Sequence, residues 1–282
     1  SDGLPIIHHS GYTCDLPPNH RFPMGKFPRV LHFLIKDQVV SEKQVWVPQT
    51  ASERLLGCVH TEEYLSSFIG GRINEREQRR TGFPWGTVLA AEVALWRGLA
   101  CSTAGGTHHA FPSYGSGFCL LNDLAVAAKH VTSSSERKVL IVDLDVHQGD
   151  GTAFIFKEEP RVFTFSVHCG KNFPVRKQQS DLDVSVDEGQ EDEQYLSTAH
   201  LPWLLDTFRP DLVLYDAGVD PHRDDELGRL RLTDRLYDRD LYVMKTALRR
   251  GVPVAAVIGG GYSKDLDKLA VRHSIVHRAA TQ

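Results

Sequence analysis

The stretch KVLIVDLDVH, residues 138–147, decides how this chain folds. It begins as a largely apolar run, which is the pattern of a strand buried on both faces of a parallel sheet. Asp143, Asp145 and His147 then alternate at its end, so their side chains share one face if the strand continues that far. Ionisable groups that leave a buried strand together need a partner or a cation, because an unpaired buried charge is costly. The stretch therefore predicts a buried strand with a polar, metal-binding site at its carboxyl end.

Apolar runs on either side of this stretch predict the rest of the sheet. Strands are expected at 162–167, 212–215 and 253–258, with a weaker first strand at 5–8. Helices are expected at 87–100, 122–132, 193–208, 238–249 and 264–280. This alternation predicts an α/β fold over residues 1–282: a single domain with a mostly parallel multi-stranded sheet and helices on both faces. Segments 70–85 and 172–192 carry no apolar period and are expected to be exposed loops.

The composition excludes several other classes of protein. With 41% hydrophobic and 24% charged residues among 282, the chain is globular rather than disordered. A net charge of -4 does not favour nucleic-acid binding, and the longest apolar stretches are too short to span a membrane. Five cysteines without a C-x-x-C pair favour a reducing compartment, so we expect an intracellular, cytoplasmic protein. The missing initiator Met leaves an organellar location open, if a targeting segment was removed.

A second predicted strand, LVLY, leads into Asp216 and Asp220. Carboxyl ends of parallel strands are where open α/β sheets bind ligands, so these acids are expected near Asp145 and His147. One of them would complete a three-ligand site whose fourth position is left for water, as in catalytic zinc centres. Asp216 could instead cap its strand, and spacing alone does not decide between the two acids.

Two further motifs carry residues suited to catalysis. His108 and His109 follow a Gly-Gly turn, and beside a metal one imidazole can accept a proton while the other supplies positive charge. Asp143 and Asp150 are available to orient these rings. Gly259-Gly260-Gly261-Tyr262 follows the predicted strand 253–258, and there the Tyr262 hydroxyl could donate to an oxyanion.

Five motifs in this order resemble the zinc-dependent histone deacetylase family, which has the arginase/deacetylase fold. They are GGTHHAFPSYGSGFCLLND (105–123), DLDVHQGDGTAFIF (143–156), FSVHCGKNFP (165–174), DAGVDPH (216–222) and IGGGY (258–262). The segment PPNHRFPMGKF (17–27) is most similar to bacterial-type and class IV members. Gln148 stands where many relatives have a second His, and three glycines rather than four precede Tyr262.

The resemblance implies a role for each matching residue. It makes Asp145, His147 and Asp220 the zinc ligands, so that Asp216 returns to capping its strand. It also implies that His109 is the general acid/base, oriented by Asp150, and that His108 is its partner, oriented by Asp143. Tyr262 would polarise the carbonyl, and an acyl-lysine tunnel would be lined by Gly117, Phe118 and Phe173. A structural potassium ion is implied at Asp143 and Ser166.

The implied reaction is hydrolysis of the amide between an acetyl or longer acyl group and a lysine side chain. An acetylpolyamine or another acylated small amine is the alternative substrate, because the same zinc residues would serve it. A binuclear manganese ureohydrolase is less favoured, since it needs an Asp two residues after Asp216, where this chain has glycine. A metal-free acyl-lysine reader is disfavoured because every reacting position is filled. No nucleic-acid or membrane partner is expected.

Overall fold

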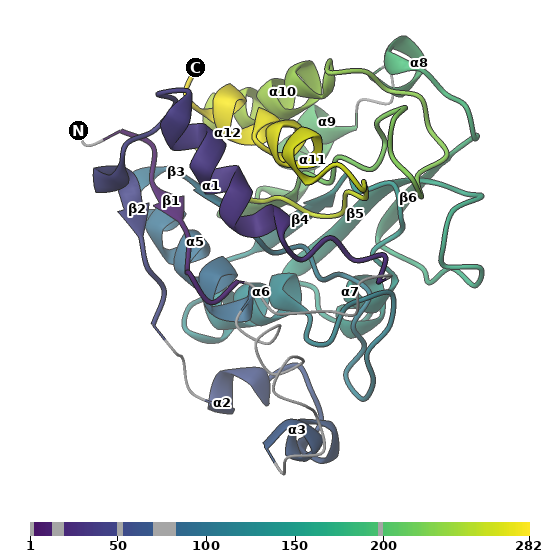
Figure 1. Ribbon diagram of the computed structural model, residues 1–282. Helices are drawn as coiled ribbons and strands as arrows, with labels where there is room; N and C mark the ends of the chain where they lie inside the picture. The colour runs from purple at the N-terminus through teal and green to yellow at the C-terminus, as the bar shows by residue number, and fades with distance from the viewer. Residues whose placement is uncertain (1–2, 13–19, 50–52, 70–82, 197–199) are drawn as a thin grey trace.

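The computed structural model describes residues 3–12, 20–49, 53–69, 83–196 and 200–282. One sheet of eight strands runs in the order β2-β1-β3-β8-β7-β4-β5-β6, with all neighbouring strands parallel. Figure 1 shows helices on both sides of it. The single-domain α/β fold expected from the sequence is therefore confirmed. The strands are β1 (Ile6–Ile7), β2 (Val45–Trp46), β3 (Leu99–Ser102), β4 (Val139–Asp143), β5 (Val162–Cys169), β6 (Leu182–Val186), β7 (Leu212–Asp216) and β8 (Val254–Val257).

Two helical layers bury the sheet. One face packs against α5 (Phe83–Arg97) and α6 (Asp123–Ser133). The opposite face packs against α1 (Lys26–Lys36), α9 (Leu201–Phe208), α10 (Leu236–Leu248), α11 (Leu266–His273) and α12 (Ile275–Ala280). Shorter helices lie in the connections: a 3-10 turn (Glu42–Gln44), α2 (Glu53–Leu56), α3 (Glu62–Ile69), α7 (Asp150–Ile155) and α8 (Asp192–Leu196).

The central strands are apolar throughout because each face meets a helical layer. Along β4, Val139 and Ile141 pack with the α5 and α6 layer, whereas Leu140 and Val142 pack with the α10 and α12 layer. Such period-two burial removes apolar surface from water on both sides of the sheet. Each Å² of apolar surface that is buried stabilises the fold by roughly 25 cal/mol. The predicted strands at 5–8, 138–144, 162–167, 212–215 and 253–258 are confirmed as β1, β4, β5, β7 and β8.

The structure corrects several expected boundaries. The helix expected at 87–100 begins earlier and ends at Arg97, because Leu99–Ser102 form β3 instead. Segment 172–192 contains the edge strand β6, in which Leu182, Val184 and Val186 pack on the α10 side of the sheet and the residues between them are exposed. The helix expected at 264–280 is interrupted at Ser274, and the one expected at 193–208 appears as α8 and α9, with 197–199 outside the described residues. Of the loop expected at 70–85, residues 70–82 also lie outside them, and 83–85 open α5.

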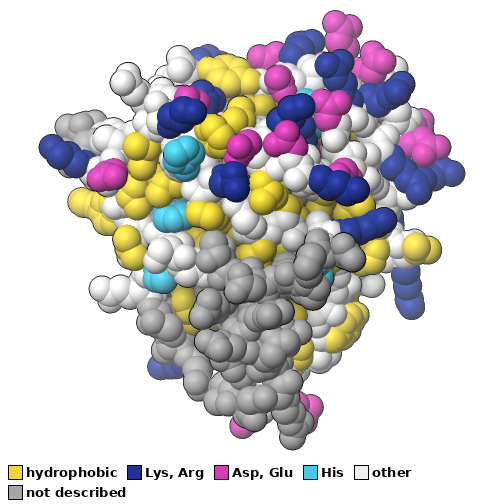
Figure 2. Space-filling view, in the orientation of Figure 1, with side chains coloured by type: hydrophobic (Ala, Val, Ile, Leu, Met, Phe, Trp, Pro, Cys, Tyr) yellow, Lys and Arg dark blue, Asp and Glu magenta, His cyan; other side chains and the backbone are white. Residues whose placement is uncertain are grey.

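The visible surface carries charges of both signs. Figure 2 shows basic and acidic side chains intermixed in its upper part, where Figure 1 places α10 and α11. This mixture agrees with the small net charge of the whole chain. Among the described residues, no helix is both long and apolar enough to cross a membrane.

Candidate active site

The carboxyl ends of β4 and β7 bring the expected polar residues to one edge of the sheet. Asp143, the last residue of β4, pairs in register with Asp216, the last residue of β7. Strand β4 ends at Asp143, so Asp145 and His147 lie beyond it and the three side chains do not share one strand face. A hydrogen-bonded turn brings the residues together instead. Asp145 N donates to Asp143 Oδ1 (3.2 Å), and His147 N donates to Asp145 Oδ1 (2.9 Å).

Asp145, His147 and Asp220 converge on one point. His147 Nδ1 lies 3.1 Å from Asp145 Oδ1 and 3.0 Å from Asp220 Oδ2. One candidate ligand atom from each residue lies within 4.8 Å of the other two, and all three residues are buried. The spacing of residues left Asp216 and Asp220 open as the third member, and the fold groups Asp220 with the other two.

This donor set fits a zinc ion. Burial disfavours the charged form of His147, but its hydrogen bonds to Asp145 and Asp220 outweigh burial and raise its pKa to about 10. Burial and the nearby Asp145 raise the pKa of Asp220. Two buried carboxylates around one imidazole thus call for a shared cation, and carboxylate oxygen with imidazole nitrogen is a zinc donor set. A Cβ at Gly260 would lie 2.4 Å from Asp220 Oδ2 and 2.6 Å from Asp145 Oδ2, so glycine keeps this cradle open.

Each of the two adjacent histidines is held by its own carboxylate. His108 Nδ1 lies 2.5 Å from Asp143 Oδ2, and His109 Nδ1 lies 2.6 Å from Asp150 Oδ1. Burial opposes protonation of His108, but Asp143 and Asp145 outweigh it and raise its pKa well above the usual range. Burial and the neighbouring His108 lower the pKa of His109 to about 4. The two rings therefore differ: His108 is stabilised as a cation, and His109 as a neutral ring whose Nε2 can accept a proton.

Asp216 does not cap its strand. It is fully buried, and neither carboxyl oxygen has a hydrogen-bond partner among the residues that the structure describes. Its Oδ2 lies 3.7 Å from His108 Nδ1, and Asp216, His108 and Asp143 form a second buried cluster whose spacing could hold a cation. The expected capping role is therefore wrong, and the acid belongs to the surroundings of the His108 ring.

Tyr262 lies beside the candidate metal ligands on the loop after β8. Its ring centroid is 6.1 Å from that of His147. Burial and the nearby Asp220 raise the pKa of the Tyr262 hydroxyl well above its usual range, so it remains a hydrogen-bond donor at neutral pH. The backbone N–H of Tyr262 donates to Asp225 Oδ1 (2.7 Å), and Asp225 Oδ2 also accepts from two backbone N–H groups of its own loop. Sequence reasoning missed Asp225, because its neighbours show no strand or helix pattern.

A buried lysine also holds the loop that carries Tyr262. Lys26 is 1% exposed, and its Nζ donates to the carbonyl oxygens of Gly259 (3.4 Å) and Gly261 (3.3 Å). Its ammonium also lies 5.8 Å from the centroid of the Tyr262 ring. Burial lowers the pKa of Lys26 to about 8, although nearby carboxylates oppose this shift. Sequence reasoning missed Lys26 as well, and the available signal was a lysine on the buried face of α1.

A small cavity of about 30 Å³ joins these groups. His109, Phe118, Asp145 and Tyr262 are among the residues that line it. Gly117 lines it too, and a Cβ at Gly117 would lie 2.5 Å from His109 Cδ2.

Phe173 does not line the cavity. Its ring packs edge-on against His109 with centroids 4.9 Å apart, and the residue is 44% exposed. Of the expected tunnel residues, Gly117 and Phe118 therefore line the cavity, whereas Phe173 lies outside it and is partly exposed.

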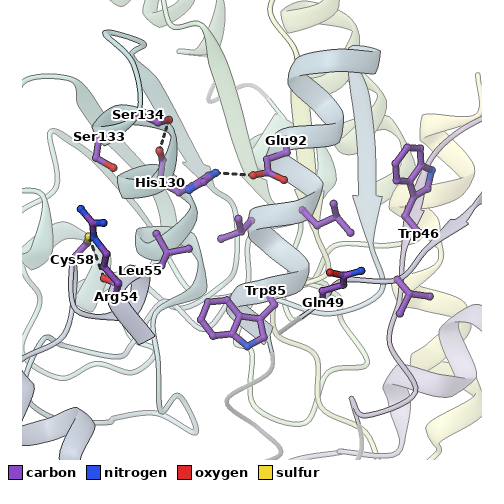
Figure 3. A pocket seen from close by; sticks show the side chains of 13 residues that line it. Trp46, Gln49, Arg54, Leu55, Cys58, Trp85, Glu92, His130, Ser133 and Ser134 are labelled. Atoms are coloured by element: carbon purple, nitrogen blue, oxygen red, sulfur yellow. Dashed lines mark hydrogen bonds and ion pairs between the residues drawn. The ribbon is translucent and has the colours of Figure 1, made fainter. Parts of the chain in front are cut away.

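Size does not distinguish this site from other cavities. A cavity of about 710 Å³ lies beside α2, α5 and α6, with Trp85 and the ion-paired Glu92 and His130 in its lining (Figure 3). None of the catalytic, metal or tunnel residues expected from the sequence lines it. The chemistry of the lining, rather than volume, identifies the candidate site.

The expected potassium pair is adjacent across two strands. Ser166 in β5 pairs in register with Asp143 in β4. Its hydroxyl makes a 2.9 Å hydrogen bond with His168 Nδ1. Both carboxyl oxygens of Asp143 already accept hydrogen bonds, from His108 and from the backbone of Asp145.

Comparisons with solved structures support this architecture. A histone deacetylase homologue from Aquifex aeolicus matches 99% of this chain and 84% of its own, with a TM-score of 0.84 and 22% identity. A histone deacetylase homologue complexed with SAHA matches with a TM-score of 0.81, 22% identity and the same shares of the two chains. At this level of identity the likeness concerns the fold alone.

Sequence comparisons identify the family. The histone deacetylase domain model matches residues 20–277. An uncharacterized protein of Picosynechococcus sp. is 50% identical, over 99% of this chain and 98% of its own. Histone deacetylase 2 of Arabidopsis thaliana is 31% identical, over 92% of this chain and 74% of its own, and the acetoin utilization protein AcuC of Staphylococcus aureus is 27% identical, over 86% and 72%. The chain therefore belongs to the histone deacetylase family.

Proposed function

We propose that this protein is a zinc-dependent hydrolase that removes an acetyl or longer acyl group from the amine of a lysine side chain. Membership of the histone deacetylase family supports the hydrolase class. The observation that carries the proposal is the convergence of Asp145, His147 and Asp220 next to the His109–Asp150 pair and Tyr262. A metal cradle, a base and a hydroxyl donor around one cavity are the parts that amide hydrolysis requires.

The zinc ion would be held by Asp145, His147 and Asp220. When bound, it supplies Lewis-acid polarisation of the substrate carbonyl and lowers the pKa of water toward about 7. Asp150 accepts a hydrogen bond from His109 Nδ1, which leaves His109 Nε2 to take the proton from the attacking water. The same ring then delivers a proton to the departing amine. His108, between Asp143 and Asp145, places positive charge beside the reacting atoms.

The Tyr262 hydroxyl donates to the carbonyl oxygen as negative charge develops on it. Asp225 fixes the backbone of Tyr262, and Lys26 fixes the loop that carries it. The hydroxyl donor is therefore held in place before the reaction begins. Preorganised donors of this kind contribute most in a buried site from which water is excluded.

Phe118 and Phe173 are the proposed walls for the substrate's aliphatic stem, and Gly117 lies against both His109 and Phe173. Aromatic rings suit an apolar chain of methylene groups. An acylated small amine remains the alternative substrate, because it needs the same metal and base. We also retain Asp143 and Ser166 as a candidate potassium pair, which thermal melts in potassium and in sodium buffers would test.

Substrate profiling tests the proposed reaction. The zinc-loaded protein is incubated with an acetyl-lysine peptide, a long-chain acyl-lysine peptide and an acetylpolyamine, and the released amine is measured. We expect the lysine peptides to be turned over faster than the polyamine. Faster turnover of the acetylpolyamine would establish the alternative, and no turnover of any of the three would contradict the proposed function.

Tyr262→Phe is expected to lower kcat by roughly 100-fold, on the order of 3 kcal/mol, with little change in KM. The hydroxyl matters most when the carbonyl oxygen becomes charged, so its loss affects the transition state more than substrate binding. Steady-state kinetics on an acyl-lysine peptide measures this, with circular dichroism to verify the fold. A large rise in KM with normal kcat would assign the hydroxyl to ground-state binding.

Gly117→Ala is expected to lower kcat by roughly tenfold or more. The new Cβ would lie 2.5 Å from His109 Cδ2 and 2.9 Å from the Phe173 ring, and Gly117 has a φ of +51°, which a side chain disfavours. The His109 ring must therefore move. Gly189→Ala is a matched control: Gly189 also has a positive φ, but a Cβ there meets nothing within 4 Å. Equal kinetics in the two variants would contradict the proposed contact.

A further inference from the structure

Arg239, on α10, is a buried cation that the proposed reaction does not use. It is 2% exposed and is among the largest fully buried side chains. Its Nε donates to Asp240 Oδ1 (3.0 Å), and its Nη1 donates to the carbonyl oxygen of Leu144 (3.2 Å). The guanidinium thus links the acid beside it on α10 to the backbone just beyond the end of β4.

The carbonyl that Arg239 holds belongs to the peptide bond between Leu144 and Asp145. The N–H of this same peptide donates to Asp143 Oδ1 at 3.2 Å. Tyr195 OH lies 3.5 Å from the Leu144 oxygen as a second donor. Both polar ends of one peptide plane are therefore fixed, and the orientation of this plane sets the direction in which the Asp145 side chain leaves the backbone.

Asp240 connects the same network to β7, the strand that precedes Asp220. Asp240 Oδ1 also accepts a hydrogen bond from Tyr215 OH at 2.5 Å. Tyr215 precedes Asp216 at the end of β7, and β7 lies beside β4 in the sheet. The network thus joins α10 to the carboxyl ends of both β4 and β7.

Arg239 lies outside the catalytic cavity. Tyr215 and Leu144 belong to the apolar cluster on the α10 side of the sheet, and Arg239 is not among the residues that line the cavity around His109 and Tyr262. It cannot be a catalytic residue, because nothing in this arrangement brings it to the substrate. Its effect must pass through the backbone that it holds.

Stability alone does not account for this buried pair. Removing an arginine and an aspartate from water costs several kcal/mol for each charge, and an apolar pair of similar size is often at least as stable. What an apolar pair cannot provide is a hydrogen bond to the Leu144 carbonyl. A role in fixing the direction of the Leu144 carbonyl would explain why two charges are buried here.

We propose that Arg239 is a positioning residue for the metal site: by holding the Leu144 carbonyl, it orients Asp145 toward His147 and Asp220. The inference rests on the proposed function in one respect, namely that these three residues bind a metal. It predicts that disturbing Arg239 weakens metal binding without unfolding the protein. Outer residues that orient metal ligands typically contribute 10- to 100-fold to metal affinity.

The test compares metal affinity in three variants. Arg239→Lys keeps a charge for Asp240, but a single ammonium cannot reproduce the forked contact with Asp240 and Leu144. Arg239→Met combined with Asp240→Asn removes both charges and leaves an acceptor for Tyr215. Arg250→Lys is the matched control, because Arg250 lies just after α10 and binds the exposed Asp206.

Zinc affinity is measured by competition with a chromophoric chelator, and folding by thermal melts of the metal-free proteins. We expect affinity to fall at least tenfold in both Arg239 variants and to stay unchanged in the control. We also expect the metal-free Arg239→Met/Asp240→Asn variant to remain folded, since it buries no unpaired charge. If Arg239→Lys fails to fold, this double variant still decides the question.

Wild-type affinity in a folded Arg239→Met/Asp240→Asn variant would overturn the proposal, because the pair would then be structural only. A wild-type protein that binds zinc but hydrolyses no acylated amine would refute the proposed function while the affinity comparison still tests Arg239. A wild-type protein that binds no zinc would refute both.

Discussion

Asp220→Asn is expected to abolish turnover by removing the bound metal. Asn keeps an oxygen in the position of Asp220 Oδ1, which accepts from Val146 N at 2.8 Å, so the loop can remain in place. The carboxylate oxygen facing His147 is lost, and with it one of three proposed ligands. We expect zinc affinity to fall by roughly 100-fold or more, given that even outer residues contribute 10- to 100-fold. Elemental analysis of purified protein should give one zinc per chain in the wild type and much less in the variant.

The metal-free proteins provide the control for folding. Thermal melts of the metal-free wild type and of Asp220→Asn separate loss of the metal from loss of the fold, because Asp220 also hydrogen-bonds to His147 and to the backbone of Val146. Asp224→Asn, an exposed acid of the same loop, should retain both zinc and activity. Full zinc content in Asp220→Asn would contradict the proposed ligand set. Two manganese ions per wild-type chain would instead favour the ureohydrolase alternative.

His109→Ala is expected to lower kcat by roughly a thousandfold, or about 4 kcal/mol of transition-state stabilisation. The proposed reaction passes its proton through His109, whose Nδ1 is held by Asp150 and whose ring faces the cavity. His108→Ala should keep a larger remnant of activity, because this ring supplies charge and not a proton path. Initial rates at saturating peptide measure both variants.

Asp150→Asn is the matched test of how His109 is oriented. An amide can accept the Nδ1–H bond but stabilises an imidazolium less well than a carboxylate does, so kcat should fall toward that of His109→Ala. Circular dichroism separates these losses from unfolding. Equal residual activity in His108→Ala and His109→Ala would mean that the proton is shared between the rings, and the assignment to His109 would fail.

Much of this architecture could be predicted from residue patterns alone. Strands β4, β5, β7 and β8 are short apolar runs because both faces of the sheet contact helices. Such runs can be recognised in the sequence itself. Elements whose burial is mixed were harder to predict. Strand β3 continues directly from a helical apolar pattern. In the edge strand β6 apolar residues alternate with polar ones, because only one face of this strand packs against the core.

The candidate metal ligands could also be named from the sequence, since ionisable groups at the ends of buried strands stand out in the pattern. The tunnel and potassium residues were implied only by the family resemblance. Only the tertiary structure decided how the ionisable groups are arranged. Asp216 and Asp220 are equivalent by spacing, but the register with β4 places one beside His108 and the other beside His147. Lys26 and Arg239 act on loops more than 90 residues away, and such contacts leave no local period. The local hydrophobic pattern indicates which side chains are buried. The partner of a buried charge comes from a distant segment of the chain, and only the folded sheet brings the two together.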